Sequence, residues 1–384
     1  MIFFMGTNPT VLLRDDDRHR IATGVKKFHD AGYYGERVIA ASGESWARSQ
    51  YNPGDLVYDP LGIGGEPGGD PHSIHTASTF FQVAPKAKLY MLYSSDGIWR
   101  GDGTYESKFL NKSTEIIEKV GITNMFVSLN FGTRHEEFFT DLATWMNRNP
   151  NFKFFWAAGN DSNKKSNAIM EVQEVIGVAA YTLMADGTMN PAYYSSLSEN
   201  VDFSAPSMIY TNINATKPTD SGYPNSGTSF STPWLCGMSC LVDDFFLDKK
   251  GTPLTNAGMV QFFKDHCIDL RDPGFDTKTG WGAVVLPDPA EIDIEKYFAI
   301  GRDVVPKPDE GGNDMLLDKY DDKDKVSTWA KEAVEWALET KILQGTSETT
   351  ISPGDVVTRE MMCVFMKRLY DKLSSNTTFF EDLK

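Results

Sequence analysis

The sequence predicts an α/β fold, with a parallel sheet flanked by helices, followed by a small, mainly helical C-terminal domain. Through residues 1–300, short apolar runs that end in Gly, Ser or Asn alternate with stretches of helical periodicity. Such alternation is typical of parallel strands joined by crossover helices. Residues 301–318 carry two prolines, a Gly pair and alternating charges without periodicity, so we interpret them as a linker. The expected domains are therefore 1–300 and 319–384.

The individual elements follow from the apolar pattern and from the residues that end each run. Buried strands are expected where four to nine mostly apolar residues stop at Gly, Ser or Asn, and helices where apolar residues recur at helical spacing. In chain order, the elements are a strand at 37–41, a helix beginning at 70–80, a strand before 92, a helix at 107–120, a strand at 124–132, a helix at 136–148, a strand at 153–157, and C-terminal helices at 327–340 and from 358.

Length and composition indicate a globular protein that does not bind nucleic acid. The 384 residues are 41% hydrophobic and include 24 Phe and 8 Trp, which can fill a sizeable core. The net charge is −16, from 53 acidic and 37 basic residues, and no basic stripe occurs. Phosphate binding needs clustered Lys and Arg, so nucleic acid is excluded as an expected partner.

Four cysteines are too few and too scattered to form a disulfide framework. Cys236 and Cys240 are four residues apart, Cys267 follows His266, and Cys363 lies near the C-terminal end. A metal site is one interpretation, but the sequence has no Cys-x-x-Cys pair. We favour small buried apolar side chains and assign no metal site.

The N-terminal segment predicts no export signal. Its apolar start, residues 1–6, is shorter than the apolar region of a signal peptide and has no basic residues before it. No apolar run approaches the length of about 20 residues that a membrane span needs. We expect a chain that is cytoplasmic as synthesised, and an association with a cell envelope, a phage or a spore stays open.

The most informative stretch is 225–242, a Gly-containing turn that leads into a helix that is hydrophobic all round. Ser229 lies at the N-terminal end of this helix. Unpaired backbone N–H groups and the positive end of the helix dipole favour negative charge there, which suits a nucleophile. The alternative is that Thr228, Ser229 and Ser231 are ordinary N-cap residues.

Two segments upstream carry further polar side chains at element ends. His72 and His75 open a helical stretch, where a histidine is more often structural than catalytic, as we expect for His75. Asn160 follows Gly159 directly after a buried strand, and an Asn in this context is usually a turn residue. The order of the three segments along the chain gives them a common explanation.

Together these motifs resemble those of the subtilisin-like serine proteases, the subtilases. Segment 227–233 is similar to the Gly-Thr-Ser-x-x-x-Pro signature of the family, 72–75 to His-Gly-Thr-His, and 157–160 to Ala-Ala-Gly-Asn. The likeness extends over residues 20–295. It implies that Ser229 attacks a peptide carbonyl, that His72 is the general base, and that Asn160 donates its side-chain N–H to the oxyanion.

The resemblance also implies where the substrate binds. The strand that ends at Ser128, Leu129 and Asn130 matches the family strand that lines the pocket for the side chain before the scissile bond and pairs with the substrate backbone. Ala158 and Gly159 precede the oxyanion residue and are assigned to substrate binding in the same way. A strand that simply ends in a turn stays the alternative for each position.

One position departs from the family pattern. The subtilase strand that matches 37–41 ends in Asp-Ser/Thr-Gly, and Ala41 stands where the catalytic aspartate is expected. Alanine cannot accept a hydrogen bond from the imidazole of a histidine. Three interpretations are open: Glu44 or Asp70 reaches His72 instead, the chain is a pseudoprotease that binds a peptide or a partner, or the alanine was introduced to silence the enzyme.

The C-terminal unit resembles a single S-layer homology (SLH) module. The likeness rests on the Trp-Ala-Lys-Glu-Ala-Val, Ile-Leu-Gln-Gly, Ser-Pro and Val-Thr-Arg-Glu patterns at 329–334, 342–345, 352–353 and 357–360. It implies binding to bacterial cell-wall polymer through residues 319–384. The family's Thr-Arg-Ala-Glu is Thr-Arg-Glu-Met here, and a plain helical packing domain is the alternative.

The sequence as a whole predicts a serine endopeptidase that hydrolyses peptide or protein substrates. No cofactor is assigned. Calcium enters only because it commonly stabilises the subtilase family, and we identify no set of ligands for it in the sequence.

Overall fold

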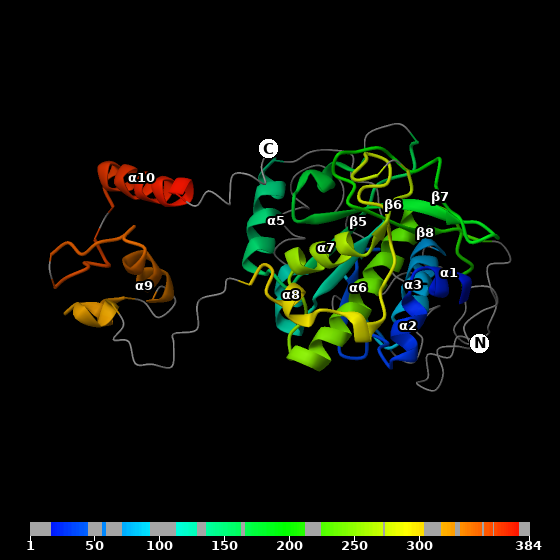
Figure 1. Ribbon diagram of the computed structural model, residues 1–384, viewed down its shortest axis with the longest axis horizontal. Helices are drawn as coiled ribbons and strands as arrows, with labels where there is room; N and C mark the ends of the chain where they lie inside the picture. The colour runs from blue at the N-terminus through cyan, green and yellow to red at the C-terminus, as the bar shows by residue number, and fades with distance from the viewer. Residues whose placement is uncertain are drawn as a thin grey trace. The chain divides into compact units, whose positions relative to one another are not determined.

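The computed structural model of the chain describes residues 17–44, 56–58, 71–92, 113–128, 136–162, 166–211, 224–271, 273–302, 316–326, 331–347, 349–355 and 357–375. Two compact units make up the chain, Met1–Asp303 and Val304–Lys384 (Figure 1).

A mostly parallel sheet forms the centre of the first unit, as the sequence predicts. Its hydrogen-bonded order is β2-β3-β1-β4-β5-β6-β8-β10-β9, and β7 pairs with the C-terminal end of β6, at Tyr181–Leu183. The strands from β2 to β10 along this order run parallel, whereas β9 and β7 are antiparallel additions. The strand bounds are β1 Ile39–Ser42, β2 Val57–Tyr58, β3 Lys88–Met91, β4 Asn124–Val127, β5 Lys153–Ala157, β6 Val175–Leu183, β7 Met189–Pro191, β8 Phe203–Ser207, β9 Cys267–Ile268 and β10 Ala283–Val284.

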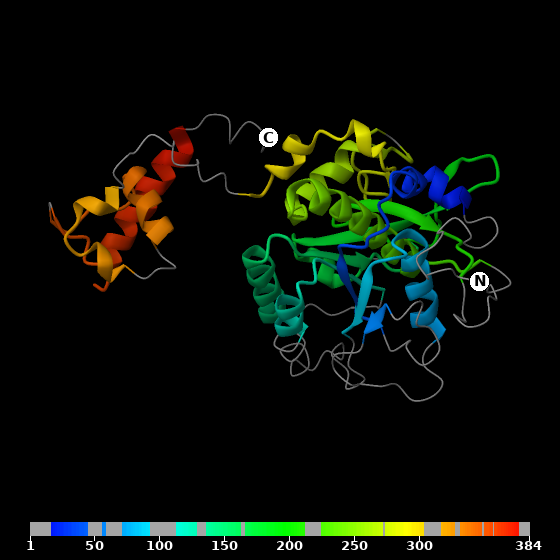
Figure 2. The same ribbon diagram turned by 90° about the horizontal axis from the view of Figure 1, so that it is seen from below.

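Helices cover both faces of this sheet, and Figure 2 shows α5 in teal and α7 in yellow-green on opposite sides of it. Phe80 of α3 and Trp234 of α6 belong to one buried cluster, and Phe138 and Leu142 of α5 belong to another. Two hydrophobic layers therefore separate the sheet from its helices. The helix bounds are α1 Asp17–Ala22, α2 Val25–Asp30, α3 Pro71–Val83, α5 Glu136–Arg148, α6 Thr228–Lys250, α7 Asn256–Asp265 and α8 Ile294–Phe298, with a further helical stretch at 113–120.

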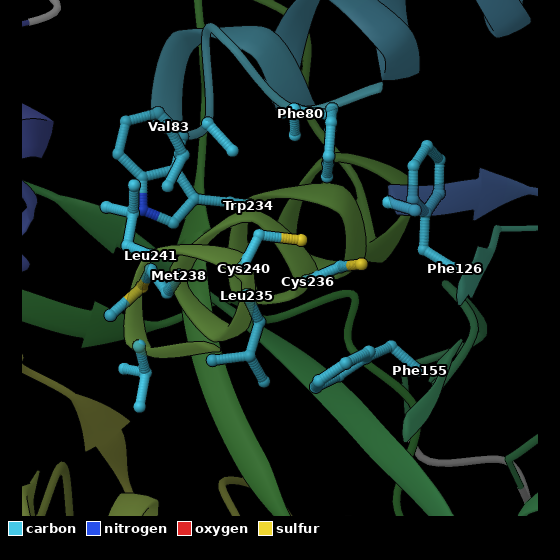
Figure 3. Packing of buried hydrophobic residues seen from close by; sticks show 14 of the residues in the cluster. Phe80, Val83, Phe126, Phe155, Trp234, Leu235, Cys236, Met238, Cys240 and Leu241 are labelled. Atoms are coloured by element: carbon cyan, nitrogen blue, oxygen red, sulfur yellow. The ribbon is translucent and has the colours of Figure 1, made fainter. Parts of the chain in front are cut away.

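Helix α6 is buried over most of its length. Every residue from Thr228 to Phe246 is buried, which explains why the sequence shows no polar face there. Figure 3 shows its apolar side chains between α3 and the sheet. Gly237 lets α3 approach closely, since a Cβ at this position would lie 2.7 Å from the Cβ of Val83.

The four cysteines differ in how deeply they are buried. Cys236 and Cys240 are free thiols buried in α6, which agrees with their interpretation as small apolar side chains, and burial raises the pKa of Cys240. Cys267, to which the same interpretation applies, is only half-buried, and Cys363 is exposed on α10 (Arg359–Ser375). A helix with little of its surface covered leaves its thiol in solvent.

A small cluster of buried residues holds the second unit together. Leu317, Val326, Leu338 and Ile351 form its core, and Thr358 caps α10 by accepting the backbone N–H of Met361 at 3.1 Å. The predicted helix start after Thr358 is thus confirmed. Its other elements are η6 Leu316–Lys319, η7 Lys323–Lys325 and α9 Lys331–Glu339. In the part of the chain that the structure describes, no helix is long and apolar enough to cross a membrane.

A buried ion pair joins β5 to α6. Lys153 Nζ lies 2.6 Å from Asp243 Oδ2, and both side chains are 0% exposed. Asp243 also accepts two further hydrogen bonds, one from Asn124 Nδ2 at 2.7 Å and one from the Leu254 backbone N–H at 3.1 Å. Burial raises the pKa of Asp243, and the neighbouring Lys153 opposes this shift. The pair therefore depends on both partners being present.

We expect Lys153→Met to lower the free energy of unfolding by about 3–5 kcal/mol, because it leaves the Asp243 carboxylate buried without a cation. The double variant Lys153→Met/Asp243→Asn removes both charges and keeps one side-chain oxygen as an acceptor for either Asn124 or Leu254, so it should recover part of the loss. Urea denaturation of the three proteins measures the effect. Equal destabilisation of the single and double variants would contradict the assignment.

Candidate active site

Several polar residues follow the carboxyl ends of neighbouring parallel strands. β1 pairs with β4, and β4 with β5, so their ends meet at one edge of the sheet. Glu44 follows β1, Ser128 follows β4, and Asn160 follows β5. The N-terminal ends of α3 and α6 carry His72 and Ser229. The edge where parallel strands end is where open α/β sheets bind ligands.

Among the residues that the structure describes, Glu44 is an acid that contacts His72. Its Oε2 lies 2.9 Å from His72 Nδ1, and its Oε1 accepts the backbone N–H of Ser128 at 2.7 Å. The Glu44 side chain is 0% exposed and that of His72 is 32% exposed. A buried carboxyl group is costly unless its oxygens are hydrogen-bonded, and here both are. With Nδ1–H as the donor, His72 keeps its Nε2 unprotonated and able to accept a proton.

Ala41 faces the other side of the sheet. Ala40 belongs to the cluster that contains Ile74 and Phe80 of α3, whereas Ala41 belongs to the cluster that contains Met125 and the α5 residues. Successive strand residues point to opposite faces, so a longer side chain at 41 would extend away from α3 and His72. Strand β1 also ends one residue later than predicted, at Ser42, whose Oγ accepts the N–H of Glu44 at 3.2 Å.

Ser229 lies at the start of α6, next to the helix that carries His72. The rings of His72 and Phe230 are 6.0 Å apart. The Ser229 hydroxyl donates to the Ser128 carbonyl at 3.4 Å, and no hydrogen bond among the described residues joins Ser229 to His72. In ligand-free enzymes such bonds are often long or absent and form only with substrate.

The amide of Asn160 is held in one orientation by Thr228. Asn160 Oδ1 accepts the Thr228 N–H at 2.9 Å and the Thr228 hydroxyl at 3.1 Å. Because the oxygen faces α6, the Nδ2 group points away from Thr228 and can donate to another oxygen. Gly227 makes the turn before α6 at φ 135°, a conformation that glycine adopts most readily. This arrangement suits an oxyanion site.

The remaining predicted site residues are placed as follows. Ser128 is 9% exposed, Ala158 is buried, and Gly159 donates its N–H to Thr228 Oγ1 at 3.2 Å. The predicted residues Leu129 and Asn130 lie outside the described residues, as does Asp70, the other candidate acid.

Tyr194 supports the turn before Ser229, a role that its sequence context did not reveal. Its hydroxyl accepts the Gly227 N–H at 3.1 Å and bonds the Ser207 hydroxyl at 2.5 Å. Burial raises the pKa of Tyr194, so this hydroxyl stays protonated at neutral pH. Tyr194 is followed by two serines in the sequence, which is the pattern of a turn.

The described part of the chain contains no group of three or more His, Cys, Asp or Glu side chains that could hold a metal ion.

The chain belongs to the subtilase family, whose model matches residues 63–282, and an S-layer homology domain matches residues 319–361. Solved structures with a similar fold include a lanthipeptide protease, with a TM-score of 0.54, 17% identity, and coverage of 71% of this chain and 93% of that one. The PatG macrocyclase domain gives a TM-score of 0.57 at 15% identity, covering 75% and 99%.

Fervidolysin from Fervidobacterium pennivorans, a keratinolytic enzyme related to subtilisin, gives a TM-score of 0.56 at 19% identity, covering 72% of this chain and 46% of its own length. No curated protein matches the chain. At these identities the solved structures share the fold, and the subtilase assignment supports a serine protease.

We expect Thr228→Val to lower kcat for peptide hydrolysis by roughly 5-fold, because a hydrogen bond contributes on the order of 1 kcal/mol and about 1.4 kcal/mol changes a rate tenfold. The variant keeps the hydrogen bond from the Thr228 backbone N–H to Asn160 Oδ1 but removes the one from the Thr228 hydroxyl. Thr228→Ser retains the hydroxyl and should keep most of the activity. Initial rates with a chromogenic peptide measure the effect, and full activity in Thr228→Val would show that Asn160 needs no such support.

Proposed function

We propose that the chain is a serine endopeptidase in which Glu44, His72 and Ser229 form the catalytic triad. The observation that supports this most directly is the contact of 2.9 Å between Glu44 Oε2 and His72 Nδ1. It supplies a carboxylate for His72 in a chain that has Ala41 where the family pattern has aspartate.

In the proposed reaction, His72 Nε2 takes the proton of the Ser229 hydroxyl while Oγ attacks the peptide carbonyl carbon. The carbonyl oxygen becomes an oxyanion, which the Asn160 side-chain N–H and the Ser229 backbone N–H stabilise. Glu44 stabilises the imidazolium of His72. His72 then returns the proton to the leaving amine, and an acyl-enzyme on Ser229 results. A water molecule, deprotonated by His72, hydrolyses this ester.

Glutamate suits this role because of the way its two oxygens are used. Oε1 is held by the Ser128 N–H, so Oε2 has little freedom to turn away from His72. The side chain is fully buried, which strengthens both hydrogen bonds. An acid that follows the strand end can therefore take over from one within the strand.

A pseudoprotease that binds peptides is the second candidate. It is favoured by the bond from the Ser229 hydroxyl to the Ser128 carbonyl, which leaves the hydroxyl unpaired with His72. A serine-directed fluorophosphonate probe separates the two functions. Labelling that disappears in Ser229→Ala supports the peptidase, and absence of both labelling and hydrolysis supports the binder.

For the second unit, we propose that residues 319–384 bind bacterial cell-wall polymer and place the protein at a cell envelope. The S-layer homology match at 319–361 supports this proposal. Trp336 on α9 is 51% exposed, and an exposed indole is well suited to stack on a sugar ring.

We expect Glu44→Gln to lower kcat by roughly 10⁴-fold, the effect of the corresponding change in serine proteases. The Ser128 N–H would hold the amide oxygen of the new side chain, so its NH₂ group would face His72 Nδ1 and impose the tautomer that cannot act as a base. Glu36→Gln is the matched control, because the Glu36 side chain is 66% exposed and pairs with Lys86, so it should keep full activity. Hydrolysis rates and fluorophosphonate labelling measure both variants.

Ala41→Asp distinguishes Glu44 from a missing aspartate. If Glu44 is the acid, a carboxylate at 41 enters an apolar cluster and brings no gain in kcat, together with a lower unfolding midpoint. A rise of orders of magnitude in kcat would instead show that position 41 lacks its acid, and would overturn the role of Glu44.

We expect the full chain to sediment with purified bacterial wall polymer and a chain that ends at Asp303 to remain in solution. Trp336→Ala should weaken retention of the full chain, whereas Val357→Ala, at an apolar residue of the same unit that is 49% exposed, should not. Equal retention of the full and shortened chains would leave the second unit with a packing role only.

A further inference from the structure

We propose that Ser128 is a positioning residue that fixes the acid and the nucleophile of the site to each other. This inference rests on the proposed function and assigns a role to the Ser128 side chain itself. The backbone N–H of Ser128 contacts Glu44, and its hydroxyl and its carbonyl both contact Ser229.

The backbone N–H of Ser128 holds the acid. It donates to Glu44 Oε1 at 2.7 Å, the shorter of the two bonds that this carboxyl group makes with Ser128 and His72. Ser128 directly follows β4, whose pairing with β1 and β5 fixes the backbone there. The acid is therefore anchored to the sheet rather than to its own loop.

The hydroxyl of Ser128 holds the nucleophile. Ser128 Oγ donates to the Ser229 carbonyl at 3.0 Å. In an α-helix this carbonyl would accept the N–H of the residue four positions later, which is Pro233 and has no N–H. Ser229 is 8% exposed, so water is largely kept away from the carbonyl. A buried carbonyl without a donor is unfavourable, and Ser128 supplies the donor that the proline lacks.

The proline and the serine therefore act together. Pro233 removes the internal hydrogen bond of the first turn of α6, and Ser128 replaces it with a bond to β4. As a result the turn that carries Ser229 is attached to the strand end that holds Glu44. A shift of this strand end would displace the acid and the nucleophile at once.

The third contact orients the Ser229 hydroxyl in the absence of substrate. Ser229 Oγ donates to the Ser128 carbonyl at 3.4 Å, a long and therefore weak hydrogen bond. The hydroxyl must leave this carbonyl before it can donate to His72. A weak bond makes this rotation easy, and it keeps the hydroxyl oriented near its site of action.

A double-mutant cycle of Ser128→Ala and Pro233→Ala tests the proposal. Ser128→Ala keeps the backbone N–H and carbonyl and removes only the donor to Ser229. Pro233→Ala restores a helical N–H for the same carbonyl. We expect Ser128→Ala to slow fluorophosphonate labelling of Ser229 and to lower kcat by roughly 10-fold with little change in KM, and to cost at most 2–3-fold in the Pro233→Ala background. Ser128→Thr, which keeps the hydroxyl, should retain the activity.

If Ser128 had a structural role alone, Ser128→Ala would lower the unfolding midpoint, but its effect on kcat would not depend on the residue at position 233. Equal losses in both backgrounds, or no loss, would overturn the positioning role even if the enzyme is active. The same cycle measured by urea unfolding needs no activity: Ser128→Ala should lower the midpoint more with Pro233 present than with Ala. If the wild-type chain does not react at Ser229 yet this unfolding cycle shows the expected coupling, the proposed function fails and the positioning contact stands. Absence of coupling in unfolding overturns the contact.

Discussion

The buried carboxyl group of Glu44 is the constraint on which the site depends. A carboxylate with no exposed surface is tolerated only when both oxygens have donors. One donor is the His72 imidazole and the other is the Ser128 backbone N–H. The requirement to satisfy this one group therefore links the helix start at 72, the loop after β1 and the end of β4.

Helix α6 imposes a second constraint on the site. Its burial from Thr228 to Phe246 fixes its position against α3 and the sheet, so its first turn cannot move to suit the partners of Ser229. The polar contacts of Thr228 and Ser229 must instead be made by the strand ends, and Asn160 and Ser128 make them. A rigid helix core and a set of strand-end partners thus define one geometry.

Much of this arrangement follows from the sequence, and the part that does not has a physical reason. The parallel sheet and its helices are predictable because apolar runs of strand length alternate with helical periodicity. His72, Asn160 and Ser229 are recognisable from short motifs whose spacing is local. Glu44 could not be chosen over Asp70 by proximity alone, because the choice depends on how the chain folds after β1. The role of Ser128 was hidden because its partners lie 84 and 101 positions away in sequence.

The departure at position 41 becomes intelligible when the faces of the sheet are considered. Strand residues alternate, and Ala41 packs with the α5 cluster while Ala40 packs with the α3 cluster. A side chain at 41 is thus governed by the packing of an apolar layer, whereas the proposed acid, Glu44, is governed by the position of His72. In this chain the two demands are met by different residues. A histidine base requires a carboxylate oxygen at hydrogen-bond distance from its Nδ1. The α-carbon of the acid can lie at another position in the chain, provided that the segment after the strand brings the longer glutamate side chain to the same place. In the proposed triad, the anchoring of Glu44 by a neighbouring strand makes such a displaced acid as well defined as one built into the strand itself.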